Sequence, residues 1–281
     1  MTAVAVITGA AGTMGSACAR ALAPDVDVML LTDRDTSGLD ATAERVSREV
    51  QVEVHTVNAD LGDPGAVERL AARVDGLGEL RSLVHTAGLS PSMAGWREIL
   101  RVDLVAVGAL LDAFLPLVVD GSAAVLFASI AGQLGEFDAS MDALLDEPRA
   151  SDLEARFLAA IGAEPDPGAT YRLAKRAVTR LCERAAVLWG RSGGRVVSLS
   201  PGLIDTEMGR LELRHQPIKV WMAELTPVRV NTADGAVLPG RADDVARAVA
   251  FLCSDAASFV SGCDLRVDGG LVAAMNHHND S

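Results

Sequence analysis

The fold is decided by the stretch Val4-Ala5-Val6-Ile7-Thr8-Gly9-Ala10-Ala11-Gly12-Thr13-Met14-Gly15. An apolar run ends in a glycine-rich turn, and an amphipathic segment follows at once. Glycines let the backbone turn tightly and approach a pyrophosphate, whose charge is favoured at a helix N-terminus. Glycine-rich turns also occur without any ligand. Here the predicted strand before the turn and the predicted helix after it favour dinucleotide binding. The candidate cofactor-binding residues of the turn are Gly9, Gly12, Thr13, Met14 and Gly15.

The same alternation continues along the chain. Short β-branched runs at 4–8, 26–33, 52–58, 83–86, 123–129, 195–200 and 263–268 predict strands. Amphipathic segments between them predict helices at 15–24, 37–50, 64–75, 95–119, 170–190 and 242–254. Alternating strands and helices indicate an α/β fold, a doubly wound parallel sheet of about seven strands with helices on both faces. No repeat or linker divides the chain, so residues 1–281 are expected to form a single domain.

Composition narrows the class of protein. The 281 residues include 25 basic and 38 acidic side chains, for a net charge of −13, and 49% of them are hydrophobic. The acidic balance argues against nucleic acid or an anionic membrane as a partner. No apolar run approaches the roughly 20 residues of a transmembrane helix, and no basic segment precedes the first strand as in a secretory signal. Four widely spaced cysteines indicate reduced thiols, so we expect a cytoplasmic protein.

Two long segments interrupt the alternation, and both follow the carboxyl end of a strand, where ligands bind in open α/β sheets. Residues 133–169 form a helical, lid-like insertion, and residues 207–240 form an expected substrate loop. The apolar side chains expected to wall a substrate site are Met141, Leu144, Leu145, Phe157, Leu158, Met208, Trp221 and Met222. The alternative is that the insertion packs onto the domain or forms a subunit contact. The polar tail 276–281 carries two histidines expected to be solvated, and no metal site is expected.

Further candidates for cofactor binding lie at successive strand ends. Asp33 ends the second strand and is placed to accept hydrogen bonds from a ribose diol, whereas it would repel a 2′-phosphate. The neighbouring Arg34 could instead hold that phosphate, which would favour NADP. Because of Asp33, NAD is the favoured cofactor and NADP is the less favoured choice. The other candidates are Asp60, Leu61, Thr86, Ala87 and Gly88.

The strongest chemical signal is Tyr171-Arg172-Leu173-Ala174-Lys175. The chain has one tyrosine, and only two of its 25 basic residues, Lys175 and Lys219, are lysine. Residues i and i+4 share a helix face, so the phenol and the ammonium would be neighbours. A nearby cation favours the phenolate, which makes a tyrosine usable as a general acid and base. A coincidental pair on a surface helix is the alternative.

These motifs together resemble the short-chain dehydrogenase/reductase family, almost from end to end. The resemblance implies a Rossmann-type fold and a nicotinamide oxidoreductase that interconverts an alcohol and a ketone. It implies that Tyr171 exchanges a proton with the substrate oxygen, that Lys175 binds the nicotinamide ribose and lowers the pKa of Tyr171, and that Ser129 holds the substrate oxygen. Pro201, Gly202, Ile204 and Thr206 would enclose the nicotinamide.

The sequence departs from the family pattern at four places. Thr13 stands where the turn usually has its middle glycine, and His85-Thr86 stand where two asparagines are usual. Asp103 replaces an asparagine, and is expected either to stabilise the charged form of Lys175 or to have no catalytic effect. The insertion at 133–169 separates Ser129 from Tyr171 and resembles the branch of bacterial hydroxysteroid dehydrogenases and carbonyl reductases.

The leading hypothesis is an NAD-dependent dehydrogenase or reductase with Ser129, Tyr171, Lys175 and Asp103 as its catalytic candidates. The apolar walls favour a bulky hydrophobic alcohol or ketone, steroid- or terpenoid-like, over a sugar or a short hydroxy acid. An epimerase or dehydratase that retains NAD, and a cofactor-binding sensor without chemistry, are the alternatives. A homodimer or homotetramer is the expected assembly.

Overall fold

The computed structural model describes residues 1–63, 65–228, 230–231, 237–238 and 240–277. Its core is a sheet of seven parallel strands in the order β11-β6-β5-β4-β1-β2-β3. The strands are β1 (Ala3–Thr8), β2 (Val28–Asp33), β3 (Glu53–Asn58), β4 (Glu79–His85), β5 (Val118–Phe127), β6 (Arg195–Pro201) and β11 (Asp264–Val267). The chain crosses from one half of the sheet to the other after β3, so the carboxyl ends of β1 and β4 flank a crevice. The predicted doubly wound α/β fold is confirmed.

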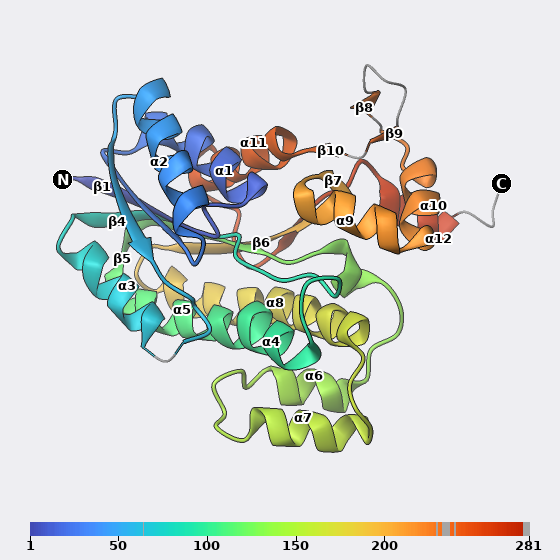
Figure 1. Cartoon of the computed structure of the whole chain (residues 1–281). Helices are drawn as coiled ribbons and strands as arrows, with labels where there is room; N and C mark the ends of the chain where they lie inside the picture. The colour runs from blue at the N-terminus through green and yellow to red at the C-terminus, as the bar shows by residue number, and fades with distance from the viewer. Residues whose placement is uncertain (64, 229, 232–236, 239, 278–281) are drawn as a thin grey trace.

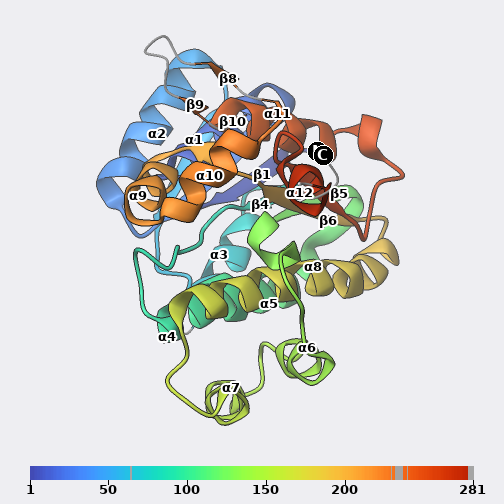
Figure 2. The same ribbon diagram turned by 90° about the vertical axis from the view of Figure 1, so that its right-hand side faces the viewer.

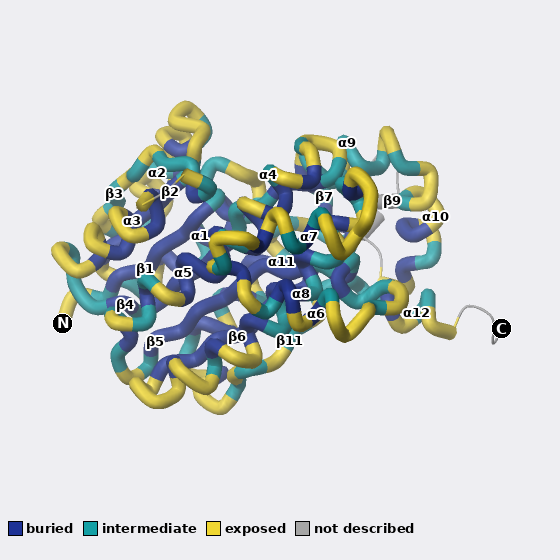
Figure 3. The backbone as a smooth tube through the Cα atoms, turned by 90° about the horizontal axis from the view of Figure 1, so that it is seen from below, coloured by how far each residue is buried: buried dark blue, intermediate teal, exposed yellow. Residues whose placement is uncertain are grey.

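Helices cover both faces of this sheet (Figures 1 and 2). One face carries α1 (Thr13–Leu22), α2 (Thr36–Glu49) and α11 (Ala242–Cys253). The other carries α3 (Ala66–Asp75), α4 (Trp96–Leu100), α5 (Ala106–Phe114) and α8 (Pro167–Gly190). Because both faces are covered, inner strands such as β1 and β6 are buried along almost their whole length, as Figure 3 shows. The edge strand β3 is more exposed because it has a neighbour on one side only.

The segment predicted as one helix over 95–119 is divided. Helix α4 passes through a π-helical stretch at Arg101–Val105 into α5, which ends at Phe114. Pro116 follows within a short 3-10 turn, where a proline can be accommodated, and β5 begins at Val118 rather than at residue 123. Single π-helical turns occur often at functional sites, and this one contains Asp103.

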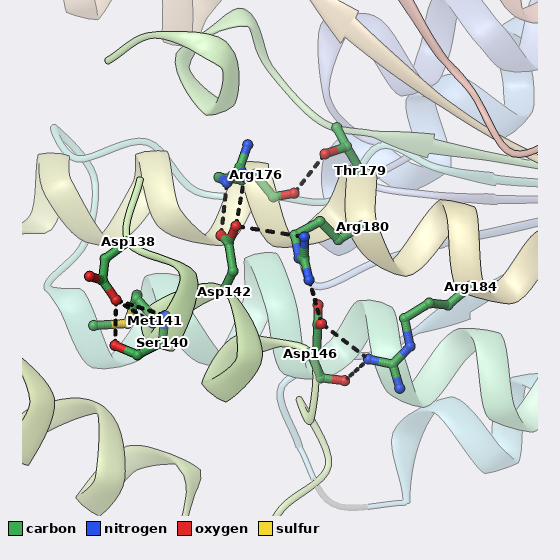
Figure 4. Close-up of polar contacts among 9 residues, drawn as sticks. All are labelled: Asp138, Ser140, Met141, Asp142, Asp146, Arg176, Thr179, Arg180 and Arg184. Atoms are coloured by element: carbon green, nitrogen blue, oxygen red, sulfur yellow. Dashed lines mark hydrogen bonds and ion pairs between the residues drawn. The ribbon is translucent and has the colours of Figure 1, made fainter. Parts of the chain in front are cut away.

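Residues 133–169 contain two helices, α6 (Ala139–Leu145) and α7 (Leu153–Ile161), which lie outside the layer of α4, α5 and α8 (Figures 1 and 2). Figure 4 shows how α6 is held to α8. Asp142 accepts two hydrogen bonds from Arg176, at 2.8 and 2.7 Å, and Asp146 accepts two from Arg180, at 2.8 and 2.6 Å. Arg184 adds a hydrogen bond to the Asp146 carbonyl. This ladder fixes the insertion to the helix that carries Tyr171.

Apolar packing supports the same attachment. Phe157 is fully buried, and its ring centroid lies 5.9 Å from that of Trp96 on α4. Leu144, Leu145 and Leu153 join the same hydrophobic core. The insertion therefore packs onto the domain, the alternative left open by the sequence.

The substrate loop at 207–240 contains α9 (Glu207–His215), α10 (Pro217–Leu225), β8 (Val230–Asn231) and β9 (Val237–Leu238). Two short strands, β7 (Ile204–Asp205) and β10 (Gly240–Arg241), pair beside it. The beginning of the expected tail at 276–281 differs from the prediction, because Asn276 and His277 complete α12 (Leu271–His277). Residues 278–281 lie outside the described part of the chain. Among the described helices, none is long and apolar enough to cross a membrane.

Candidate active site

A cleft of about 380 Å³ lies at the carboxyl ends of the strands. The predicted cofactor residues that line it are Gly9, Gly12, Thr13, Met14, Gly15, Asp33, Arg34, Asp60, Leu61, Thr86, Ala87, Gly88 and Thr206. Gly9 has a φ of +69°, and a Cβ there would lie 2.6 Å from the Ala87 nitrogen. A Cβ on Gly15 would lie 2.1 Å from the Gly9 oxygen. The turn thus requires glycine at both positions, and its main chain is open to a ligand.

Asp33 is built into this turn. One carboxylate oxygen accepts the Ala11 N–H at 3.0 Å, and the other accepts the Asp35 N–H at 3.0 Å. Arg34 is paired with Glu98, at 3.2 Å. Asp33 therefore presents a fixed negative charge to the cleft, while the neighbouring guanidinium already has a carboxylate partner.

The end of β4 is fastened to the end of β1. The Thr86 hydroxyl donates to the Thr8 carbonyl at 2.7 Å, and the Thr8 hydroxyl lies 2.7 Å from His85 Nδ1. Burial, with a smaller contribution from the charge of Lys175, lowers the pKa of His85 to about 3. His85 and Thr86, which depart from the family pattern, thus join the ends of β1 and β4 by hydrogen bonds, and His85 does so as an uncharged side chain.

A second, smaller cleft of about 90 Å³ adjoins the first and shares Met14, Thr86, Gly88 and Thr206 with it. The other predicted residues that line this second cleft are Ser129, Tyr171, Lys175, Pro201, Gly202 and Ile204. Every predicted site residue except Asp103 therefore lines one cleft or the other. The structure brings the candidates together, and their individual roles remain predictions.

Helix α8 carries Tyr171 and Lys175 on one face. The helix begins at Pro167, three residues before the predicted start, because Asp166 caps it by accepting the Ala169 N–H at 2.8 Å. Lys175 Nζ donates to the Phe127 carbonyl at 3.1 Å and lies 5.7 Å from the centre of the Tyr171 ring. The Lys175 ammonium is therefore held against the end of β5, beside the phenol.

Ser129 lies just beyond β5, where its hydroxyl oxygen accepts the Ala131 N–H at 3.2 Å. The pKa of Tyr171 is raised well above its ordinary value, first by burial and then by the charge of Asp103, and hydrogen bonding to Ser129 lowers it by less. The pKa of Tyr171 is thus raised, whereas the resemblance to the family implies a lowered one. The causes are the desolvation of the phenol and the negative charge of Asp103.

Asp103 lies behind the cleft, with its side chain fully buried. Its Oδ1 is 3.6 Å from Lys175 Nζ and accepts the Leu89 N–H at 2.9 Å. Burial raises the pKa of this carboxyl, whereas Lys175 and the Leu89 N–H lower it by less. Gly88 leaves room for the pair, because a Cβ there would lie 2.7 Å from Asp103 Oδ1.

The outer wall of the second cleft comes from α9 and α10, through Met208, Leu213, Glu212 and Lys219. Met222 instead packs into a separate core cluster at 4% exposure, and neither Trp221 nor any residue of 133–169 lines the two clefts. Glu212 and Lys219 were not among the site residues predicted from the sequence. The available signal was the scarcity of lysine, since Lys219 is the second of only two.

A parallel α/β sheet with a glycine-rich turn, two adjoining clefts and a tyrosine–lysine pair on one helix face is typical of a nicotinamide-dependent oxidoreductase. The family profile described as short chain dehydrogenase matches residues 3–141, and that described as enoyl-(acyl carrier protein) reductase matches residues 140–272. The chain belongs to the short-chain dehydrogenase/reductase family of nicotinamide-dependent oxidoreductases, which includes enzymes that act on alcohols and ketones.

Two characterised relatives extend over almost the whole chain. The cis-4-hydroxycyclohexanecarboxylate dehydrogenase of Sinomonas cyclohexanicum is 31% identical, with 96% of each chain covered. The meso-2,3-butanediol dehydrogenase of Serratia marcescens is 28% identical, covering 96% of this chain and 95% of its own. The structure of levodione reductase superposes with a TM-score of 0.76 at 24% identity, over 96% of this chain and 98% of that one. This last likeness supports the fold alone.

Proposed function

We propose that this protein is an NAD(H)-dependent dehydrogenase or reductase that interconverts a bulky hydrophobic alcohol and its ketone. The observation that carries the proposal is the meeting of Ser129, Tyr171 and Lys175 in a cleft that opens into the dinucleotide cleft. Hydride transfer requires the cofactor and the substrate to meet. Side chains that bind the reacting oxygen of the substrate are therefore expected where the two clefts adjoin.

The three side chains have distinct roles in this proposal. In the oxidative direction Tyr171 accepts the proton of the substrate hydroxyl, and in the reductive direction it returns that proton to the carbonyl oxygen. Ser129 holds the substrate oxygen, and Lys175 keeps a positive charge beside the phenol. A nicotinamide enclosed by Pro201, Gly202, Ile204 and Thr206 would supply hydride transfer to or from the substrate carbon.

The cofactor cleft fits a dinucleotide. Gly9 and Gly15 leave the main chain of the turn open at the N-terminus of α1, which suits a pyrophosphate. Asp33 supports NAD over NADP, because a 2′-phosphate would meet its carboxylate and Arg34 is already paired with Glu98. Pro201, Gly202, Ile204 and Thr206 would enclose the nicotinamide end.

The substrate side is mostly apolar. Ile130, Leu203, Met208 and Leu213 line the second cleft, and they support a hydrophobic carbon skeleton. Met208 on α9 also lines the first cleft, so it would contact both the cofactor and the substrate. The insertion at 133–169 no longer supports the substrate choice, because its apolar side chains are used in packing.

The test is a panel of alicyclic, terpenoid and steroid alcohols with NAD and NADP, followed by absorbance at ~340 nm, where reduced nicotinamide absorbs. A dehydrogenase produces NADH in bulk, whereas an epimerase or dehydratase returns its cofactor unchanged and a sensor only binds it. Absence of NADH formation with every alcohol, and of NADH consumption with every ketone, would refute the proposal. We further propose a homodimeric or homotetrameric assembly in the cytoplasm, which chromatography with light scattering and cell fractionation test separately.

A further inference from the structure

Two charged side chains line the second cleft together with the reacting groups. Lys219 on α10 lies with its Nζ 3.4 Å from Glu212 Oε2 on α9. The Lys219 and Glu212 side chains are only 17% and 13% exposed, and both line the cleft that contains Ser129 and Tyr171. Lysine and glutamate are among the residue types least often buried. The two side chains are paired with each other, and they place two charged groups in the wall of the cleft that contains Tyr171.

Exposed ion pairs on the surface of the chain are more solvated than this one. In the Arg48–Glu44 pair on α2, the side chains are 69% and 72% exposed, which is the usual solvated arrangement. The Glu212–Lys219 pair lacks that solvation and lies among apolar neighbours such as Leu213. Among the described residues, no second carboxylate pairs with the Lys219 ammonium. An ammonium has three donors, so donor capacity remains available to a ligand.

The pair lines the same cleft as the reacting groups. The charge of Glu212 also raises the pKa of Tyr171, by less than burial and Asp103 do. A substrate whose hydroxyl or carbonyl oxygen reaches Tyr171 therefore lies in a cleft whose wall includes Glu212 and Lys219. Apart from the reacting groups, these are the only charged side chains among the residues that line the second cleft.

The chemistry of the pair selects the ligand group. A hydroxyl accepts a hydrogen bond from Lys219 Nζ and donates one to Glu212, so it satisfies both charges at once. A carboxylate would meet the negative charge of Glu212 and would have to separate the pair. A purely hydrocarbon group would desolvate both ions without replacing their hydrogen bonds.

We propose that the Glu212–Lys219 pair recognises a second, neutral oxygen on the substrate, which makes the preferred substrate a hydrophobic diol or hydroxyketone. This inference rests on the proposed oxidoreductase function and adds the substrate class to it. Tyr171 and Ser129 act on one oxygen, while Glu212 and Lys219 hold the other. The two polar ends of the cleft then set the orientation of an otherwise apolar molecule.

The experiment uses the ring skeleton of the alcohol that the enzyme oxidises fastest in the panel described above. Its mono-alcohol, its diol and its hydroxy acid are compared by kcat/KM in the full chain with saturating NAD. We expect the diol to exceed the mono-alcohol by ~10–100-fold, the range that one or two hydrogen bonds to charged groups supply. Preference for the hydroxy acid, or equal use of mono-alcohol and diol, would overturn the inference while leaving the proposed function intact.

Two variants test the residues themselves. Lys219→Met keeps the length of the side chain and removes its donors, so the ratio of diol to mono-alcohol should fall toward one. Glu212→Gln keeps the shape and removes the negative charge, so relative activity on the hydroxy acid should rise. Because each ratio compares two substrates at one pH, changes in proton transfer at Tyr171 cancel.

The matched control is Arg48→Met, which breaks the exposed pair with Glu44 and should leave both ratios as in the wild type. Circular dichroism and thermal melting check that each variant is folded. Unchanged ratios in the folded Lys219→Met and Glu212→Gln variants would refute the role of the pair. If no alcohol of any skeleton is oxidised, the proposed function itself fails.

Discussion

The carboxylate of Asp103 lies 3.6 Å from the ammonium of Lys175, and its side chain is completely buried. The candidate active site thus contains an ion pair, and its lysine has two neighbours: the carboxylate of Asp103 and the phenol of Tyr171. The carboxylate offsets the cation, and its charge raises the pKa of Tyr171. The resemblance to the family implies an uncharged asparagine at this position, so this chain has a negative charge at the candidate site where the family pattern has none.

The first prediction concerns the variant Asp103→Asn. It keeps the shape and an acceptor for the Leu89 N–H but removes the charge that raises the pKa of Tyr171. The phenolate therefore forms at lower pH, and the acid limb of kcat/KM for alcohol oxidation should move to lower pH. The other groups near the phenol, Lys175 and Glu212, are unchanged, and His85 stays neutral above its pKa of about 3. A superimposable pH profile would show that Asp103 is only structural.

The second prediction concerns Tyr171→Phe. Loss of the positioned proton donor and acceptor should lower kcat by ~10²–10⁴-fold. NAD affinity, measured by calorimetry, should stay close to that of the wild type because the dinucleotide cleft is formed largely by other residues. Ser129→Ala, which removes only a hydrogen-bonding group, should retain more activity. Near-normal turnover in Tyr171→Phe would disprove the assigned role.

A third prediction addresses cofactor choice. The wild type should use NAD more efficiently than NADP, and Asp33→Asn should reduce that preference by about tenfold or more, because like-charge contact costs several kcal/mol. The amide of asparagine still offers an acceptor for the Ala11 N–H, so the turn is retained. The measurement is kcat/KM with each cofactor. A wild type that favours NADP would contradict the reading of Asp33.

The insertion provides the fourth prediction. Phe157→Ala should lower the free energy of unfolding by ~3–5 kcal/mol, as expected for removal of a buried aromatic ring. The KM for the substrate should not change, because Phe157 lines neither cleft. Urea titration and steady-state kinetics provide the two readouts. An increased KM with unchanged stability would restore the insertion as a substrate wall.

The fifth prediction concerns the stability of the fold at acid pH. Hydrogen bonding to Arg176 holds the pKa of Asp142 below its ordinary value, so the ionised form stabilises the fold. That contribution is complete above the ordinary pKa of an aspartate and is lost as the pH falls through the lowered value. Asp142→Asn should therefore cost ~1–3 kcal/mol at neutral pH, and the difference from the wild type should narrow in acid. The control is Asp152→Asn, at an exposed pair with Arg156, which should have little effect. A constant difference at all pH values would contradict this account.

Local patterns in the amino-acid sequence were enough to predict the fold and the place of most candidate site residues. Buried parallel strands have apolar runs, and their carboxyl ends meet at one edge, so motifs such as Gly9–Gly15, Asp33 and Thr86–Gly88 could be assigned to one crevice. Tyr171 and Lys175 were recognisable because helical spacing places them side by side. These inferences depend on local periodicity and strand order, which the order of residues encodes directly.

The positions of the charged pairs and of the long loops around the sheet became visible in the folded chain and could not be predicted from its local patterns. Asp103 lies beside Lys175 because a π-helical turn packs against α8, and the Glu212–Lys219 pair depends on how α9 and α10 fold over the cleft. The insertion packs against α8 through Asp142 and Asp146 instead of over the strand ends. Each of these features joins segments whose relative positions follow from packing the whole chain. Burial and charge balance depend on those positions, and no local pattern of residues specifies them.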